Sequence, residues 1–255
     1  SFTALDNIDL TMNEGEILGF IGPNGAGKTT TIRVMLGMLK ATRGEVKIFG
    51  KDAWKDAVEL HKRIAYVPGE ANLWPNLSGG EVIDLFIRMK GNGKQSRREE
   101  LIERFALDPT KKCGVYSKGN RQKIALIAAF SSDADLYILD EPTSGLDPLM
   151  ERVFQECVAE VWAEGKSVLL SSHILSEVEK LCDKVAIIRE GRIIETGTLS
   201  DLRHLTRTKL TVKTKQPLTA LHEAKGINDL ERHGEELCFQ VDTEEMDAVT
   251  RYICQ

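Results

Sequence analysis

The sequence lacks an apolar stretch long enough to cross a membrane. A membrane-spanning helix needs roughly 18 to 20 apolar residues, and the longest relevant run here covers only residues 124–130. That run is typical of a buried helix segment, and no secretory signal peptide is recognisable. We therefore expect any membrane role of this chain to depend on a partner.

Paired cysteines and excess positive charge are also missing. The five cysteines are scattered without Cys-x-x-Cys spacing, which argues against a disulfide framework or a zinc site and favours a reducing compartment. The formal net charge of −5 gives no general attraction to nucleic acid or acidic lipid. No internal repeat or long low-complexity segment is found. These absences leave an ordinary globular chain with no nucleic-acid partner expected.

What the sequence does contain is a glycine-rich stretch that fits the phosphate-binding pattern G-x-x-x-x-G-K-[ST]. It follows the apolar run at 17–21 and precedes a helical pattern at 30–38, so a chance glycine loop is disfavoured. Glycines let successive N–H groups point at phosphate oxygens, Lys28 can reach the β- and γ-phosphates, and Thr29 can ligate Mg²⁺. The predicted nucleotide-binding residues are Gly22, Pro23, Asn24, Gly25, Ala26, Gly27, Lys28, Thr29 and Thr30.

The overall pattern predicts an α/β fold. Strand-like runs at 17–21, 63–67, 136–140, 167–171 and 185–188 alternate with helical patterns, which favours a mainly parallel sheet. Residues after the carboxyl ends of such strands meet at one edge of the sheet. We therefore expect the phosphate loop, residues 140–141 and residues 171–173 to lie close together.

Two further regions depart from this alternation. A helical subdomain is predicted at about 71–130, with a solvated loop at 91–98, because apolar residues recur there at helical spacing. From residue 206 the pattern predicts a small α+β appendage, with strands at 209–214 and 237–241 and helical segments at 220–224 and 244–253. We therefore divide the chain into domains 1–205 and 206–255.

A pair of carboxylates follows the apolar run at 136–139. Asp140 is placed to hold Mg²⁺, and Glu141 to polarise an attacking water molecule. A solvated turn is the alternative interpretation, but the phosphate loop earlier in the chain favours the catalytic one.

The order of motifs over about residues 1–205 resembles the ABC-type ATPases, the nucleotide-binding subunits of ATP-binding cassette transporters, which have a P-loop NTPase core. Residues 144–148 look like the D-loop of this family, and residues 169–173 look like its switch strand. The resemblance implies that His173 contacts the γ-phosphate. The alternative is a histidine that caps a helix at 174–181.

The family also has a signature loop, for which the chain offers two candidates. Residues 77–81 (Leu-Ser-Gly-Gly-Glu) match the usual letters better, but residues 116–120 (Tyr-Ser-Lys-Gly-Asn) directly precede a helix and the strand at 136–140. This spacing favours residues 116–120, so Ser117 and Gly119 are predicted to bind nucleotide across a dimer. Lys118 and Asn120 differ from the usual Gly and Gln, and we expect an altered rather than abolished function.

Two other family positions are less direct. Tyr66-Val67-Pro68 is followed by Gly69-Glu70 where the family has a glutamine, so Glu70 is the candidate Mg²⁺ ligand in its place. Phe2 is the candidate for the aromatic residue that stacks on adenine.

The resemblance implies an ATPase, with ATP and Mg²⁺ as cofactors, that drives a separate membrane permease, most similar to bacterial drug and antibiotic exporters. It further implies a homodimer, or a heterodimer with a paralogous ATPase, in the cytoplasm at the inner face of the membrane, with membrane contact only through the permease. One alternative is a soluble ABC ATPase that acts in protein assembly or remodelling, since the cassette is single. A regulatory, non-hydrolysing cassette is disfavoured by Lys28, Asp140, Glu141 and His173.

Overall fold

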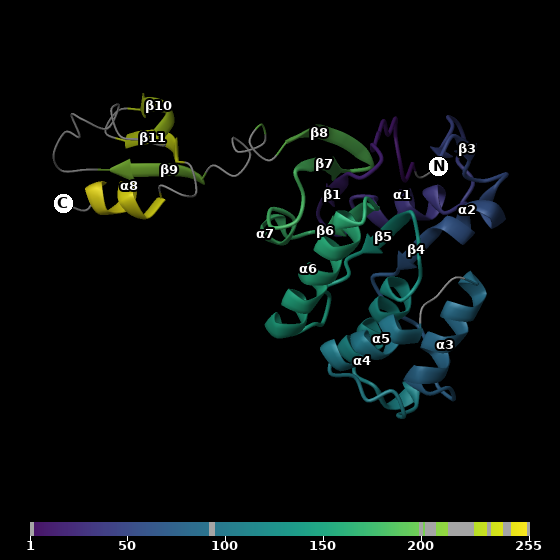
Figure 1. Cartoon of the computed structure of the whole chain (residues 1–255). Coiled ribbons are helices and arrows are strands. Elements are labelled where there is room, and N and C mark those ends of the chain that lie inside the picture. Colours follow the sequence, from purple (N-terminus) through teal and green to yellow (C-terminus); the bar gives the residue numbers. More distant parts are fainter. Residues whose placement is uncertain are drawn as a thin grey trace. The chain divides into compact units, whose positions relative to one another are not determined.

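A computed structural model describes residues 3–91, 95–198, 201, 208–213, 227–233, 236–241 and 246–253. The chain divides into two compact units, 1–196 and 197–255 (Figure 1). The domain boundary predicted between residues 205 and 206 lies outside the described residues and stays a prediction. Phe2 also lies outside them.

The first unit is built on a six-stranded sheet with the order β4-β5-β6-β1-β7-β8. Its strands are β1 (Ile17–Ile21), β4 (Ile64–Val67), β5 (Leu136–Asp140), β6 (Ser167–Ser172), β7 (Lys184–Arg189) and β8 (Arg192–Thr198). Strands β4, β5, β6, β1 and β7 pair in parallel. All five residues of β1 and of β5 are buried, as expected for strands covered on both faces. The α/β prediction is confirmed.

Helices surround this sheet in two groups. Helices α1 (Lys28–Met35), α2 (Ala57–Arg63), α6 (Pro148–Ala163) and α7 (Leu175–Val178) connect sheet strands. Helices α3 (Gly79–Lys90), α4 (Gln95–Arg104) and α5 (Lys118–Phe130) gather at the β4 side of the unit (Figure 1), with the 3₁₀ turn Cys113–Val115 between α4 and α5. The second group corresponds to the predicted helical subdomain.

Several predicted elements are corrected by the structure. Helix α4 begins at Gln95, inside the segment predicted as a loop, and ion pairs of Arg97 with Glu160 and of Arg98 with Asp84 stabilise its first turns. Helix α7 has only four residues instead of the predicted eight. Strand β8 and the two-residue strands β2 (Lys47–Ile48) and β3 (Lys51–Asp52) were not predicted.

The second unit contains a three-stranded antiparallel sheet with the order β10-β11-β9 and one helix. The elements are β9 (Thr208–Lys213), β10 (Ile227–His233), β11 (Glu236–Val241) and α8 (Met246–Ile253). Phe239, Val241 and Val249 form its buried core. The α+β prediction is thus confirmed for the described residues, although β10 was not predicted. The helical segment predicted at 220–224 lies outside the described residues.

Candidate functional site

The parallel sheet brings four segments with predicted site residues to one edge. Strands β4, β5, β6 and β1 are consecutive neighbours that run in the same direction, so their carboxyl ends lie side by side. At these ends lie residues 68–70, residues 140–141, His173 and the phosphate loop at 22–27. These segments are far apart in the sequence, and the topology alone collects them.

The phosphate loop is held by hydrogen bonds at Gly22 and Ala26, and its middle residues 23–25 are exposed. The N–H of Gly22 donates to the carbonyl of Ser172 (3.3 Å), and the carbonyl of Ala26 accepts from the N–H of Gly191 (2.8 Å). A Cβ on Gly22 would lie 2.2 Å from the carbonyl oxygen of Ile188, whereas one on Gly25 would meet nothing within 4 Å. Pro23, Asn24 and Gly25 are exposed. The exposed residues 23–25 leave room for a phosphate group.

Helix α1 begins directly after this loop, with Gly27 as its N-cap at φ +113° and no side-chain cap. Because no side chain satisfies the first N–H groups of the helix, they are available to an anion. Lys28 and Thr29 are the first two residues of α1, and Thr30 follows on the same turn. The local structure therefore fits the phosphate-binding interpretation of residues 22–30.

Lys28 is buried, with 5% of its surface exposed, and it is held by oxygen atoms. Its ammonium group donates to the carbonyl of Gly22 at 2.6 Å and lies 3.2 Å from Oε1 of Glu141. The ion pair joins the two motifs that were predicted separately. The carboxylate of Glu141 also balances the positive charge of Lys28, which would be costly to bury without a partner.

Thr29 and Asp140 form the pair that fits a magnesium ion. The Thr29 hydroxyl donates to Oδ2 of Asp140 at 2.8 Å, and Asp140 is only 2% exposed. A hydroxyl and a carboxylate oxygen are the hard ligands that Mg²⁺ prefers, with water and phosphate oxygens completing the octahedron. The residues present therefore fit the ion.

Glu141 has a strained backbone. Its φ is +45°, which a residue with a side chain rarely adopts outside functional or turn positions. Its N–H donates to both the carbonyl and the Oγ of Ser171, each at 3.1 Å. These bonds hold the carboxylate between Lys28 and His173, whose Nδ1 lies 3.4 Å from Oε2.

His173 does not cap a helix. Helix α7 has Ile174 at its N-cap and no side-chain hydrogen bond there, so the capping alternative is wrong. The imidazole is 45% exposed beside Glu141. The contact of His173 with the γ-phosphate stays a prediction.

Ser117 and Gly119 lie at the start of helix α5. The Ser117 hydroxyl accepts a hydrogen bond from the N–H of Asn120 at 3.3 Å and caps the helix. A Cβ on Gly119 would lie 2.2 Å from the carbonyl oxygen of Gly145, so only glycine allows this approach to the D-loop segment. Residues 116–120 are thus packed against another motif of the predicted site.

The competing motif at 77–81 has a structural role. Ser78 and Glu81 form a reciprocal capping box at the start of α3, the usual arrangement for a stable helix N-terminus. Gly79 and Gly80 are buried, and a Cβ on Gly79 would lie 2.8 Å from the hydroxyl of Tyr116. The hydrogen-bonding groups of this motif are therefore already used within the subunit.

Glu70 is exposed after the end of β4. The neighbouring Gly69 packs so that a Cβ would lie 3.2 Å from the carbonyl oxygen of Asp140. The segment therefore passes beside the Thr29–Asp140 pair. A role of Glu70 as a Mg²⁺ ligand stays a prediction.

Sequence reasoning missed residues that hold these groups in place. Ser171 donates to Oδ1 of Asp140 at 2.5 Å, and the fully buried amide of Gln122 donates to the carbonyl of Pro68 at 3.1 Å. Burial, with a smaller contribution from Asp140, raises the pKa of Tyr66 to about 12. The pair Ser171-Ser172 before His173 was a usable signal, because hydroxyls at a strand end can bond neighbouring carboxylates.

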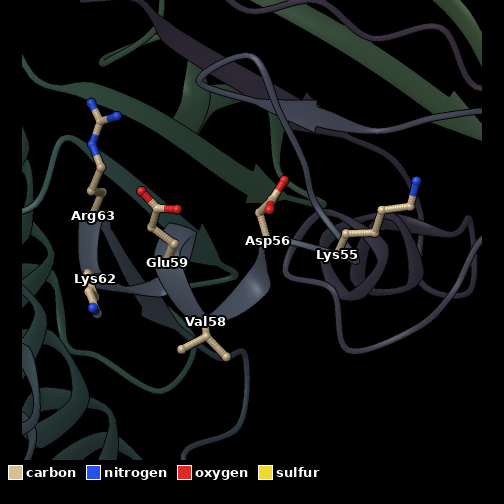
Figure 2. Close-up of a pocket in the computed structure, with 6 residues that line it drawn as sticks. All are labelled: Lys55, Asp56, Val58, Glu59, Lys62 and Arg63. Atoms are coloured by element: carbon tan, nitrogen blue, oxygen red, sulfur yellow. The ribbon is translucent and has the colours of Figure 1, made fainter.

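A hollow of about 590 Å³ lies on helix α2. Its lining consists of charged side chains of both signs and an exposed valine: Lys55, Asp56, Val58, Glu59, Lys62 and Arg63 (Figure 2). None of the predicted site residues lines it. We therefore assign it no part in the chemistry at the carboxyl edge.

Comparison with known proteins agrees with the geometry. The ABC transporter family matches residues 5–144, more than half of the chain. The uncharacterized ABC transporter ATP-binding protein YhcH of Bacillus subtilis is 38% identical over 78% of this chain and 66% of its own length, just under two thirds. The bacitracin transport ATP-binding protein BcrA of Bacillus licheniformis is 34% identical over 90% of this chain and 77% of its own.

A solved structure shows the same fold. The ATP-binding cassette MJ0796, described as a dimeric post-hydrolysis state bound to ADP and Pi, is 25% identical, with a TM-score of 0.71 over 78% of this chain and 91% of that one. ATP-binding subunits of this kind work with a membrane permease. Within the part of this chain that the structure describes, no helix is long and apolar enough to span a bilayer. The chain therefore belongs to the ABC transporter family, as one of its ATP-binding subunits with ATPase activity.

Proposed function

We propose that this chain is the motor subunit of an ABC exporter for a drug or antibiotic, and that ATP hydrolysis at the carboxyl edge drives a separate permease. The observation that carries the proposal is the continuous set of contacts from the phosphate loop through Lys28 and Glu141 to His173. The relationship to the bacitracin transport protein supports the exporter assignment.

In this account the Lys28–Glu141 ion pair is the resting state of the site. The triphosphate competes with Glu141 for the ammonium group of Lys28, because phosphate oxygens accept strong charge-assisted hydrogen bonds. Glu141 is then released from Lys28 and takes the proton of the attacking water molecule. His173, beside Glu141, holds the γ-phosphate.

Thr29 and Asp140 would hold Mg²⁺ with the triphosphate, and Glu70 would provide a further oxygen. When bound, the ion would neutralise charge that develops on the phosphate oxygens during transfer. Asp140 is kept in its orientation by the Ser171 hydroxyl. Thr29 and Asp140 would therefore hold the ion without rearrangement.

The active assembly is a dimer, formed by two copies or by one copy and a paralogous ATPase. The phosphate loop of one subunit faces Ser117 and Gly119 of the other, so ATP is enclosed between them. The exposed N-terminus of α5 and the dimeric state described for MJ0796 support this arrangement. The dimer acts in the cytoplasm at the inner face of the cell membrane.

The permease contacts the helical subdomain, near residues 71–115. Trp74 and Met89 expose 51% and 72% of their surfaces there, so both apolar side chains are accessible to a partner. A cavity of about 130 Å³ between β4, α3 and α5 is lined in part by Leu73 and Phe86. An apolar element of the permease would cover these groups.

Affinity purification of the chain from detergent-solubilised membranes tests the transporter assignment. We expect a polytopic membrane protein to copurify with the wild type and with Val58→Glu, whose side chain is exposed on α2. The membrane protein should not copurify with Trp74→Glu or Met89→Glu, although both variants should still bind ATP. Copurification that is unaffected by both changes would contradict the docking surface, and the absence of any membrane protein would favour a permease-independent ATPase.

A further inference from the structure

Helix α7 is short, but it packs against strand β1 in the middle of the sheet. Val178 is fully buried, and a Cβ on Gly19 of β1 would lie 2.2 Å from its Cγ1. Gly19 therefore makes room for Val178, and this contact fixes α7 against the strand that leads into the phosphate loop. Glu177 precedes Val178, so its backbone is held in place as well.

The carboxylate of Glu177 joins two segments that are distant in the sequence. Its Oε2 accepts hydrogen bonds from the hydroxyls of Thr143 at 3.1 Å and Ser172 at 2.8 Å. The Ser172 hydroxyl in turn accepts from the N–H of Ile174 at 3.0 Å. One oxygen atom thus connects the turn after β5 with the end of β6.

These two segments carry the groups proposed to react with ATP. Thr143 lies two residues after Glu141, and Ser172 lies one residue before His173. Nδ1 of His173 and Oε2 of Glu141 are 3.4 Å apart. The carbonyl of Ser172 also accepts the N–H of Gly22 in the phosphate loop. A displacement of either segment would therefore change the distance between Glu141, His173 and bound phosphate.

We propose that Glu177 is a positioning residue for ATP hydrolysis, which sets the separation of Glu141 and His173 through its bonds to Thr143 and Ser172. The inference rests on the roles proposed above for Glu141 and His173. Glu177 itself does not touch ATP. Its loss should lower kcat more than it raises KM, because the contacts of Lys28 with the phosphate loop do not involve it.

The test compares ATP hydrolysis by Glu177→Ala and Glu177→Gln with that of the wild type. Removal of the carboxylate should lower kcat by about tenfold to a hundredfold, because a misplacement of about 1 Å at a reacting centre can cost about a hundredfold. Glutamine keeps an oxygen with two lone pairs that can accept both hydroxyl bonds, so this variant should retain most of the wild-type kcat. A purely electrostatic role of the carboxylate would instead be lost in both variants.

Two further variants separate positioning from general destabilisation. Glu179→Ala changes an exposed carboxylate in the same segment and should leave kcat unchanged. Thr143→Val removes one of the two bonds, so it should lower kcat less than Glu177→Ala, and the double variant should be no worse than Glu177→Ala because the effects share one pathway. Thermal unfolding and ATP binding should match the wild type in each.

A wild-type kcat for Glu177→Ala would overturn the inference, and so would an equal loss in Glu177→Gln. Glu141→Gln distinguishes this result from a failure of the underlying mechanism. If Glu141→Gln is inactive and Glu177→Ala is normal, only the positioning role is wrong. If Glu141→Gln hydrolyses ATP at the wild-type rate, the proposed role of Glu141 is wrong.

Discussion

The ammonium group of Lys118 donates a hydrogen bond to the hydroxyl of Ser144 at 2.7 Å. The bond connects the segment 116–120 at the start of α5 with the D-loop segment at 144–148. Gly119 and Gly145 meet beside it. The segment proposed to face the second subunit is thus joined to the D-loop segment within one subunit, and the residue that joins them is a lysine where the family usually has glycine.

Lys118 should strengthen closure of the dimer on ATP, because its charge lies one residue from Ser117 at a helix N-terminus, which also favours an anion. Lys118→Glu should prevent ATP-dependent dimer formation, and Lys118→Met should raise the ATP concentration needed for half dimerisation. Sedimentation velocity across an ATP titration measures both. Ser144→Ala is the matched control: it leaves the lysine in place and should still dimerise, and a loss as severe as that of Lys118→Glu would contradict the account.

Lys28→Ala should weaken ATP binding by about tenfold to a hundredfold, because charge-assisted hydrogen bonds to phosphate are lost. Isothermal titration calorimetry with ATP measures the change. Lys40 is exposed in the segment that follows α1, and Lys40→Ala should bind like the wild type. Equal affinities of Lys28→Ala and wild type would show that the loop does not bind the triphosphate as we describe.

Asp140→Asn should raise the Mg²⁺ concentration required for tight ATP binding, because an amide oxygen is a weaker ligand than a carboxylate. ATP affinity without Mg²⁺ should change little. Binding titrations at several Mg²⁺ concentrations separate the two effects, with Asp9→Asn at an exposed position as the control. An unchanged Mg²⁺ requirement would remove Asp140 from the metal site.

Two buried cysteines should resist alkylation in the folded protein. Burial raises the pKa of Cys157 and of Cys182 to about 12. At pH 9 roughly one thiol in a thousand would then be a thiolate, whereas about half would be ionised at an unperturbed pKa near 9. Reactivity of these two should therefore increase only as the pH approaches 12 or when the protein unfolds.

Peptide mass spectrometry after iodoacetamide treatment at pH 9 measures this reactivity. Cys238 is only half-buried and should react before Cys157 and Cys182. Urea should make Cys157 and Cys182 reactive at the same pH. Rapid labelling of Cys157 or Cys182 without urea would contradict their placement in the core.

Strands were predicted correctly where the local sequence pattern agreed with the secondary structure that the fold imposes. Strands β1 and β5 are short apolar runs that end at a glycine loop and at an acidic pair, and both were predicted with the observed bounds. Helix α4 was misjudged at its start because its first residues are polar, and its support comes from Glu160 on another helix. Strand β10 was missed because charged residues and an irregular register near Asn228–Glu231 obscure its alternation.

In the candidate site too, some residues could be predicted from the sequence and others could not. Motif residues such as Lys28, Asp140 and Glu141 were found because their spacing along the chain is characteristic. Ser171 and Glu177 act through hydrogen bonds to residues about 30 positions away. Such contacts depend on strand order, which single-residue spacing does not encode.

The most direct test of the account is the solution mass of Glu141→Gln, by light scattering, with and without ATP and Mg²⁺. This change should preserve ATP binding and slow hydrolysis, so we expect a monomer without ATP and a dimer with it. Ser117→Arg in the same background should abolish the dimer, while Asn76→Arg, exposed beside the 77–81 motif, should not. A protein that binds ATP and stays monomeric would contradict a homodimeric site, and a dimer that survives Ser117→Arg would contradict the assignment of residues 116–120.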